Sequence, residues 1–84
     1  MISAKYLQKV LAVSYMEQVT LSEIARKTGI TFSYTLDSVK LIEDKNLLIS
    51  NKTGRCRYVK ITDKGVTTLD YLNNLFDLCE DLIE

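Results

Sequence analysis

The sequence predicts a single small α+β domain that is mostly helical and carries one β-hairpin. Apolar residues recur at steps of three and four over much of the chain, which is the spacing of amphipathic helices. Between Leu47 and Thr62 this pattern gives way to the alternation of two strands around a glycine. The chain contains no proline, which is typical of a protein built mostly from regular elements.

Length and composition limit the class of protein. The 84 residues suffice for one domain with a small core, and a hydrophobic content of 46% excludes a disordered chain. No apolar run reaches the ~18–20 residues of a membrane span. Lys9 interrupts the apolar N-terminal stretch that would otherwise resemble a signal peptide. We therefore expect a cytoplasmic protein.

The chain lacks the residue patterns on which most enzymes and metal sites depend. It has no histidine, and its two cysteines, Cys56 and Cys79, form neither a C-x-x-C pair nor a zinc-binding set. A glycine-rich phosphate loop is also missing, and many acidic residues are spread along one predicted helix. The sequence therefore predicts no enzyme, no metal site and no cofactor.

Two helices are expected in the first 28 residues. The second is short, from about Leu21 to Thr28, and the pair Thr20 and Glu23 fits a capping box at its start. Gly29 is placed to end it, because glycine adopts the left-handed conformation at little cost. The first helix presents an apolar face that consists of Ile2, Tyr6, Val10, Val13 and Met16.

A third helix is expected after a tight turn. Thr31 or Ser33 can cap its start, and the helix should run to about Lys45. Asn46 stands where a left-handed terminator is expected. The side that faces the core should consist of Thr35, Ser38, Val39 and Ile42.

A β-hairpin is expected next. The segments LLIS and RYVKIT are predicted to form two strands, joined by a loop from Asn51 to Arg55 that contains Gly54. Four of the eleven basic residues lie between Asn51 and Thr62. The hairpin is therefore the most basic part of the chain.

A long C-terminal helix should follow Thr62, which can cap it. From Val66 onward its apolar residues form a heptad-like seam that is longer than so small a core can use, so we predict a dimer interface to which the first helix contributes. The alternative, that the seam packs only on the first helix of its own chain, stays open. The predicted interface residues are Leu69, Leu72, Phe76, Cys79 and Ile83, beside a second apolar row of Leu75, Leu78 and Leu82.

Charge is divided unevenly along this formally neutral chain. Residues 1–62 contain ten basic and five acidic residues, whereas residues 63–84 contain one basic and six acidic residues. The first part therefore carries a net charge of +5 and the second part −5. This division indicates an anionic partner for the first part only.

The order helix, short helix, tight turn, longer helix, hairpin and long helix resembles the winged helix-turn-helix. Three blocks carry the resemblance within residues 2–72: TLSEIARKTGIT, SYTLDSVKLIEDKNLL and GRCRYVKITDKG. More narrowly, the sequence is similar to MarR-type regulators and to the small winged-helix regulators of archaea and their viruses. The resemblance implies a homodimeric DNA-binding transcription regulator, in the cytoplasm of the cell or of the viral host. It implies one winged-helix domain over residues 1–84, with a DNA-binding body and wing in residues 1–62 and a dimerisation helix in residues 63–84.

The third helix is then expected in the major groove and the hairpin at the adjacent minor groove of double-stranded DNA. Narrow A·T-rich minor grooves attract arginine, which makes Arg55 at the hairpin tip the candidate for insertion. The predicted DNA-binding residues are Thr31, Phe32, Ser33, Tyr34, Asp37 and Lys40 on the helix, and Lys52, Arg55 and Arg57 on the hairpin.

The third helix also departs from the resembled group, which often has arginine or lysine where Phe32 and Asp37 stand. Without an arginine, this helix cannot hold guanine in a bidentate grip. Contacts to the DNA backbone, groove shape or the methyl groups of thymine are therefore favoured. In the second helix, Arg26 and Lys27 either contact phosphate or complement the helix dipole, and Ser22 is a weaker candidate for a phosphate contact.

Three alternatives stay open. The cations of the hairpin can serve only to keep an exposed edge strand from pairing with other chains. The exposed helix face with Phe32, Tyr34, Leu36 and Asp37 also suits a module that binds protein rather than DNA. Cys79 either forms an intersubunit disulfide across a two-fold axis or stays a buried thiol.

Overall fold

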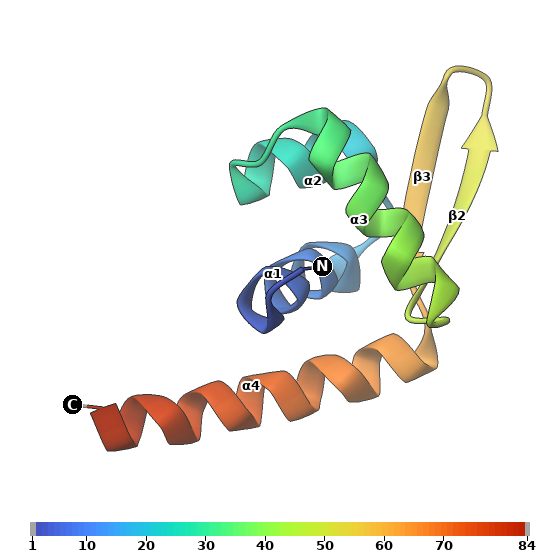
Figure 1. The fold of residues 1–84 in the computed structure, drawn as a ribbon. Coiled ribbons are helices and arrows are strands. Elements are labelled where there is room, and N and C mark those ends of the chain that lie inside the picture. The colour runs from blue at the N-terminus through green and yellow to red at the C-terminus, as the bar shows by residue number, and fades with distance from the viewer. Residues whose placement is uncertain (1, 84) are drawn as a thin grey trace.

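The computed structural model describes residues 2–83, without the side chains of residue 16 and of residues 81–83. Within this part of the chain, no helix combines the length and the apolarity that a membrane crossing requires. The elements are α1 (Ala4–Met16), β1 (Val19–Thr20), α2 (Leu21–Thr28), α3 (Phe32–Asp44), β2 (Leu48–Thr53), β3 (Cys56–Ile61) and α4 (Asp63–Ile83) (Figure 1).

The helix ends lie where local sequence signals predict them. Thr20 and Glu23 form the capping box: the Thr20 hydroxyl accepts from the Glu23 N–H at 3.2 Å, and the Glu23 carboxylate accepts from the Thr20 N–H at 3.1 Å. Gly29 ends α2 with a left-handed φ of 73°. Thr31, rather than Ser33, caps α3. After α3 the chain turns at Asn46, whose φ is 64°.

The hairpin has a shorter loop than the sequence predicts. The β2–β3 ladder extends to the pair Thr53 and Cys56, so the loop consists of Gly54 and Arg55 alone instead of residues 51–55. Gly54 has a φ of 62°, and glycine at the first of two loop positions is typical of the type II′ turn, whose twist matches that of the strands. The paired strands therefore carry Arg55 to the end of a projecting ribbon (Figure 1).

A third strand, absent from the sequence prediction, completes the sheet. Val19 pairs with Val59 and Thr20 pairs with Tyr58, which gives the antiparallel order β1–β3–β2. A strand of two residues has no periodicity of its own, and its partner lies far along the chain. Because Thr20 also caps α2, this pairing fixes the start of α2 beside the hairpin.

The core lies between the first three helices and the sheet. Ile24 from α2, Val39 from α3 and Val59 from β3 are all buried. Thr35 and Ser38 are buried as predicted, and each hydroxyl donates to the backbone carbonyl four residues earlier, at 2.8 and 2.7 Å. These small side chains satisfy their own polar groups and let α3 lie close to the body.

Gly65 allows α4 to approach the connection between α3 and β2. A Cβ atom at this position would lie 2.6 Å from Cγ1 of Ile61 and would overlap the backbone carbonyl of Leu47. The helix starts at Asp63, three residues before the apolar periodicity becomes visible, and the Thr62 hydroxyl caps it by accepting from the Gly65 N–H at 3.0 Å. α4 is therefore anchored at its first turn.

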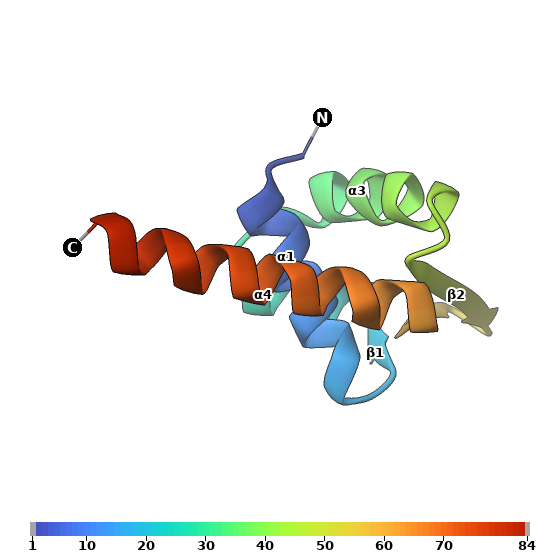
Figure 2. The ribbon, with the colours of Figure 1, turned by 90° about the horizontal axis from the view of Figure 1, so that it is seen from below.

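From this anchor α4 crosses the base of the domain, at the end opposite the hairpin tip (Figures 1 and 2). It packs on α1, where the Gln8 side-chain amide donates to Oδ1 of Asn73 at 2.7 Å. The Lys5 ammonium lies 4.8 Å from the ring centre of Phe76, within cation–π distance. The acidic helix and the basic hairpin therefore occupy opposite ends of the protein.

Candidate nucleic-acid interface

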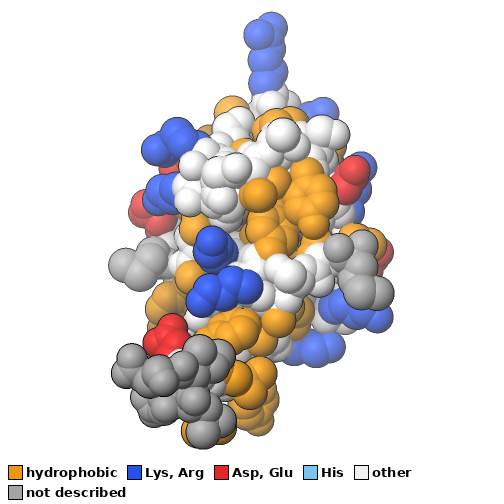
Figure 3. All heavy atoms as spheres, turned by 60° about the vertical axis from the view of Figure 1, so that its left-hand side comes forward, with side chains coloured by type: hydrophobic (Ala, Val, Ile, Leu, Met, Phe, Trp, Pro, Cys, Tyr) orange, Lys and Arg blue, Asp and Glu red, His pale blue; other side chains and the backbone are white. Residues whose placement is uncertain are grey.

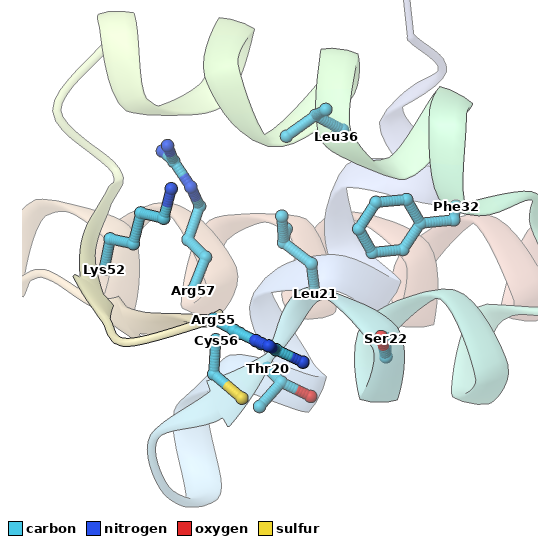
Figure 4. A pocket seen from close by; sticks show the side chains of 9 residues that line it. All are labelled: Thr20, Leu21, Ser22, Phe32, Leu36, Lys52, Arg55, Cys56 and Arg57. Atoms are coloured by element: carbon cyan, nitrogen blue, oxygen red, sulfur yellow. The ribbon is translucent and has the colours of Figure 1, made fainter.

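A groove of about 460 Å³ lies between the hairpin, the start of α2 and the first turns of α3. We call it the α3–hairpin groove. Figure 4 shows Lys52 and Arg57 pointing toward α3, with Arg55 directed toward the start of α2. Its lining consists of Thr20, Leu21, Ser22, Phe32, Leu36, Lys52, Arg55, Cys56 and Arg57.

Strand register decides which hairpin cations face this groove. Lys52 and Arg57 form a direct cross-strand pair and share the sheet face of the buried Val59. Successive side chains alternate between faces, so Lys60 lies on the opposite face of the sheet. The groove therefore receives three of the four cations that lie between Asn51 and Thr62.

Hydrogen bonds link the hairpin to the last turns of α3, beside the groove. The Arg57 guanidinium donates through Nη1 to the Ser50 hydroxyl oxygen at 3.3 Å. That hydroxyl donates to Oε1 of Glu43 at 2.8 Å. We call this chain of contacts the Glu43–Ser50–Arg57 relay. Sequence reasoning missed Glu43 and Ser50, because their pairing depends on how α3 packs beside β2.

The groove side of α3 is apolar. Phe32, in its first turn, is 51% exposed, and Leu36 follows one turn later on the same flank. Ser33, Asp37 and Lys40 are exposed on the ridge directed away from the core. The structure therefore places Phe32 with the hairpin cations, and the other three on the neighbouring outward surface of α3.

Two of the predicted residues lie on the other flank of α3. Tyr34 is 43% exposed, and its ring lies against that of Tyr6 with 5.4 Å between the ring centres. The Thr31 hydroxyl accepts from the Tyr34 N–H at 3.2 Å as the helix cap. Both residues line a separate hollow with Ser3 and Gly29 rather than the α3–hairpin groove.

The first turn of α2 forms the floor of the groove. Ser22 is exposed there, with its side chain within the groove lining (Figure 4). The backbone N–H of Thr20 lowers the pKa of the Glu23 carboxyl from its ordinary value of 4.5, with further contributions from the Thr20 hydroxyl and from two cations at the end of α2. Those cations, Arg26 and Lys27, are exposed in the last turn.

One face of the molecule, from the hairpin toward α4, carries both basic and hydrophobic side chains. Figure 3 shows one basic side chain projecting at its top, hydrophobic side chains gathered in its middle and lower part, and further lysine or arginine side chains beside and between them. Among the described residues of α4, the exposed large apolar side chains are Tyr71, Leu75 and Leu78.

The predicted dimer residues lie mostly on the flank of α4 that meets its own domain. Leu69 is buried in the core, and Leu72 packs against it. Phe76 lies beneath Lys5, and Cys79 is a half-buried free thiol. The side chain of Ile83, like that of Leu82, is outside the described residues. The second apolar row is the exposed one, with Leu75 51% and Leu78 58% exposed.

The helix–turn–helix of α2 and α3, followed by a β-hairpin beside the second helix, defines the winged helix-turn-helix fold, and the hairpin is its wing. The predicted fold class is therefore confirmed. In this fold, the second helix of the pair is the recognition helix, which is α3 here.

Solved structures with this fold come from transcription regulators and DNA-binding proteins. The transcriptional regulator BldR from Sulfolobus solfataricus is 25% identical over 93% of this chain and 60% of its own, with a TM-score of 0.82. Sso10a-2, a DNA-binding protein from the same organism, is 12% identical over 99% of this chain and 86% of its own, with a TM-score of 0.88. MepR, a transcription regulator of a Staphylococcus aureus multidrug efflux pump, is 18% identical over 93% of this chain and 61% of its own, with a TM-score of 0.81.

No family model matches the sequence, and a search of curated proteins finds no match. The chain spans about three fifths of the BldR and MepR chains. The resemblance to MarR-like winged-helix regulators, small archaeal proteins among them, is confirmed at the level of the fold.

Proposed function

We propose that the protein is a homodimeric DNA-binding transcription regulator of the cytoplasm, with α3 in the major groove and the wing at the adjacent minor groove. The observation that carries this proposal is the α3–hairpin groove, into which Lys52, Arg55 and Arg57 converge opposite the recognition helix. A DNA strand that separates a major from a minor groove would pass between these two elements. Its phosphates would meet the cations on one side and the first turn of α2 below.

The pairing of Lys52 with Arg57 supports an anionic partner. Like charges directly opposite each other on neighbouring strands destabilise a sheet. Cations that only protect an edge strand do not need to face each other or to face a groove. Lys60, for example, is a hairpin cation that lies on the opposite face of the sheet. A phosphate between the paired cations would remove their repulsion.

Arg55 would act at the minor groove. It is exposed at the tip of the ribbon, in a loop of two residues, so its position is set by the paired strands behind it. Narrow A·T-rich minor grooves concentrate negative potential and attract arginine. In the free protein the Arg55 side chain points toward the start of α2 (Figure 4). It therefore lies beside the proposed path of the DNA strand.

The dimer would form through the exposed row of α4. Tyr71, Leu75 and Leu78 recur at steps of four and three, which is the spacing of a helix–helix seam. Phe76 and Cys79, from the seam predicted first, border this row and can extend it toward α1. Two copies joined there would hold two wings and two recognition helices for a two-fold symmetric site.

An intersubunit Cys79 disulfide is a separable part of this proposal. Cys79 is half-buried and free in the single chain, and it lies at the edge of the exposed row. Cys79→Ser should lower the dimer stability in oxidising buffer and leave it unchanged in reducing buffer. Equal stability of the variant and the wild type in both buffers would rule out the disulfide and leave the helix seam intact.

A protein-binding module is the second candidate function. The apolar side chains Phe32 and Leu36 on the recognition helix favour it, because aromatic residues are enriched in protein interfaces. The salt dependence of DNA affinity distinguishes the two functions, because binding through phosphate contacts weakens steeply as the salt concentration rises.

The experiment is a fluorescence anisotropy titration of a labelled A·T-rich duplex across a salt series. We expect wild-type binding to weaken steeply with salt, and Arg55→Ala combined with Arg57→Ala to remove most of it. The matched control is Lys60→Ala, which removes a cation from the same strand but from the opposite face, and it should bind nearly as well as the wild type. Absence of binding at low salt would overturn the proposal in favour of the protein-binding module.

A further inference from the structure

The recognition helix offers a restricted set of side chains to DNA bases. α3 has the sequence FSYTLDSVKLIED, which contains no arginine, asparagine or glutamine. Arginine holds guanine, and asparagine or glutamine holds adenine, in the common bidentate contacts. The only cation on the helix is Lys40, in its third turn. Direct recognition by this helix must therefore use other chemistry.

Phe32 and Leu36 provide that chemistry. They lie one helical turn apart on the flank that lines the α3–hairpin groove, beside three cations that would hold the DNA backbone. Phe32 is in the first turn, where recognition helices approach base edges, and half of its surface is exposed. Four residues of helix advance by about 6 Å, which corresponds to about one or two base steps of about 3.4 Å each.

The major groove contains one prominent apolar group, the 5-methyl group of thymine. An apolar side chain gains from contact with this methyl group and gains nothing from the other base edges. Asp37, on the ridge beside these residues, has only acceptor oxygens when ionised, so it would repel the thymine O4 acceptor and favours the amino groups of neighbouring bases. The two apolar residues are therefore the part of α3 that can select thymine.

We propose that Phe32 and Leu36 read the 5-methyl groups of one or two closely spaced thymines, so that this helix selects T-containing sites by apolar contact. This rests on the proposed DNA-binding function and specifies which DNA the protein takes. The same A·T-rich sequences have the narrow minor groove that Arg55 would enter, so helix and wing select the same base composition by two independent means.

The test uses two duplexes of identical A·T-rich sequence, one with thymine and one with deoxyuridine at every thymine position. Deoxyuridine pairs with adenine as thymine does and lacks only the 5-methyl group. Burying one methyl-sized group is worth about a fourfold change in affinity. We therefore expect the wild type to bind the thymine duplex about fourfold more tightly if one methyl group is contacted, and about 15-fold more tightly if two are contacted.

Substitutions of the two apolar residues show whether they cause the difference. Phe32→Ala should lower the affinity ratio of the two duplexes, and Phe32→Ala combined with Leu36→Ala should bring it close to one. Leu41→Ala is the matched control: Leu41 is also 51% exposed on α3, but it lines a different hollow with Ile2 and Leu7, so the ratio should stay at its wild-type value.

Three outcomes would overturn the inference. Equal wild-type affinity for both duplexes, with binding that still requires Arg55 and Arg57, would leave the DNA-binding function standing and exclude methyl recognition. A preference for thymine that survives in the double variant Phe32→Ala with Leu36→Ala would assign the discrimination to DNA shape. Failure to bind either duplex at low salt would remove both the inference and the function on which it rests.

Discussion

Replacing Leu75 by alanine should weaken the proposed dimer by about 30-fold without unfolding the protomer. Leu75 is 51% exposed in the single chain, so about half of its side chain remains to be buried by a partner. Full burial of a leucine side chain contributes about 2 kcal/mol, which leaves about 1 kcal/mol for this half. In the proposed dimer a two-fold axis would bring two copies of Leu75 into the interface and double the loss to about 2 kcal/mol, which corresponds to about 30-fold in Kd.

Sedimentation velocity over a concentration series measures this dissociation constant directly. The matched control is Ile49→Ala, because Ile49 is 55% exposed but lies on the hairpin rather than on α4. Its dimer affinity should equal that of the wild type. Thermal unfolding of Leu75→Ala should show a folded protein, since the removed atoms are those that the domain itself leaves half uncovered.

A comparison of Phe76→Ala with Leu75→Ala shows which apolar row of α4 forms the interface. Phe76 lies beneath Lys5 of its own chain, so Phe76→Ala should lower the free energy of unfolding more than Leu75→Ala does. If Phe76→Ala dissociates the dimer while Leu75→Ala leaves it intact, the interface lies on the other row of α4. A wild-type protein that remains monomeric at the highest concentration would refute the α4 dimer altogether.

Three further substitutions test separate parts of the structure. Gly65→Ala should lower the free energy of unfolding in urea by about 1–3 kcal/mol, because the added Cβ overlaps the backbone carbonyl of Leu47, which cannot rotate away. The pKa of Glu23 is lowered by the Thr20 N–H, so its carboxylate stabilises the folded state above its ordinary pKa of 4.5, and this contribution is lost as the pH falls below that value. Glu23→Gln should therefore lower the melting temperature at neutral pH and flatten its decline in acid. Lys52→Thr removes one cation of the cross-strand pair, so the melting temperature should rise slightly, by the equivalent of about 0.2–1 kcal/mol, while DNA affinity falls.

The sequence was sufficient to place the helices because their ends depend on local interactions. The capping box of Thr20 and Glu23, the left-handed Gly29 and the turn at Asn46 each involve residues within a few positions of one another. Such contacts form in the same way whatever the rest of the chain does. The expected boundaries of α2, from Leu21 to Thr28, agree with the structure for this reason.

The two apolar rows of α4 could not be told apart from the sequence. Both rows repeat at steps of three and four, so their periodicity is the same. The position of α1 determines which row is covered: it places Leu69 in the core and leaves Leu75 and Leu78 half exposed. The short strand β1 escaped prediction for a similar reason, because it exists only through its pairing with β3.

The candidate site was predicted in part. The density of basic residues between Asn51 and Thr62 pointed to the hairpin, and three of those cations line the α3–hairpin groove. Alternation along the predicted strand RYVKIT already separates Lys60 from Arg57. The pairing of Lys52 with Arg57 could not be predicted without the two-residue loop, because the loop length fixes the register. The joint position of Phe32 and Leu36 opposite these cations required the packing of α3 beside the sheet, which no local pattern specifies.

The Glu43–Ser50–Arg57 relay joins the end of α3 to the hairpin through side-chain hydrogen bonds. A swing of the hairpin away from α3 would have to break the 2.8 Å bond of Ser50 to Glu43 or pull the helix with it. In the proposed complex, Phe32 on α3 and Arg55 on the hairpin would therefore meet DNA from two elements that are already linked in the free protein. If the protein binds DNA as proposed, a DNA segment whose groove spacing does not fit this linked pair would have to deform in order to be bound.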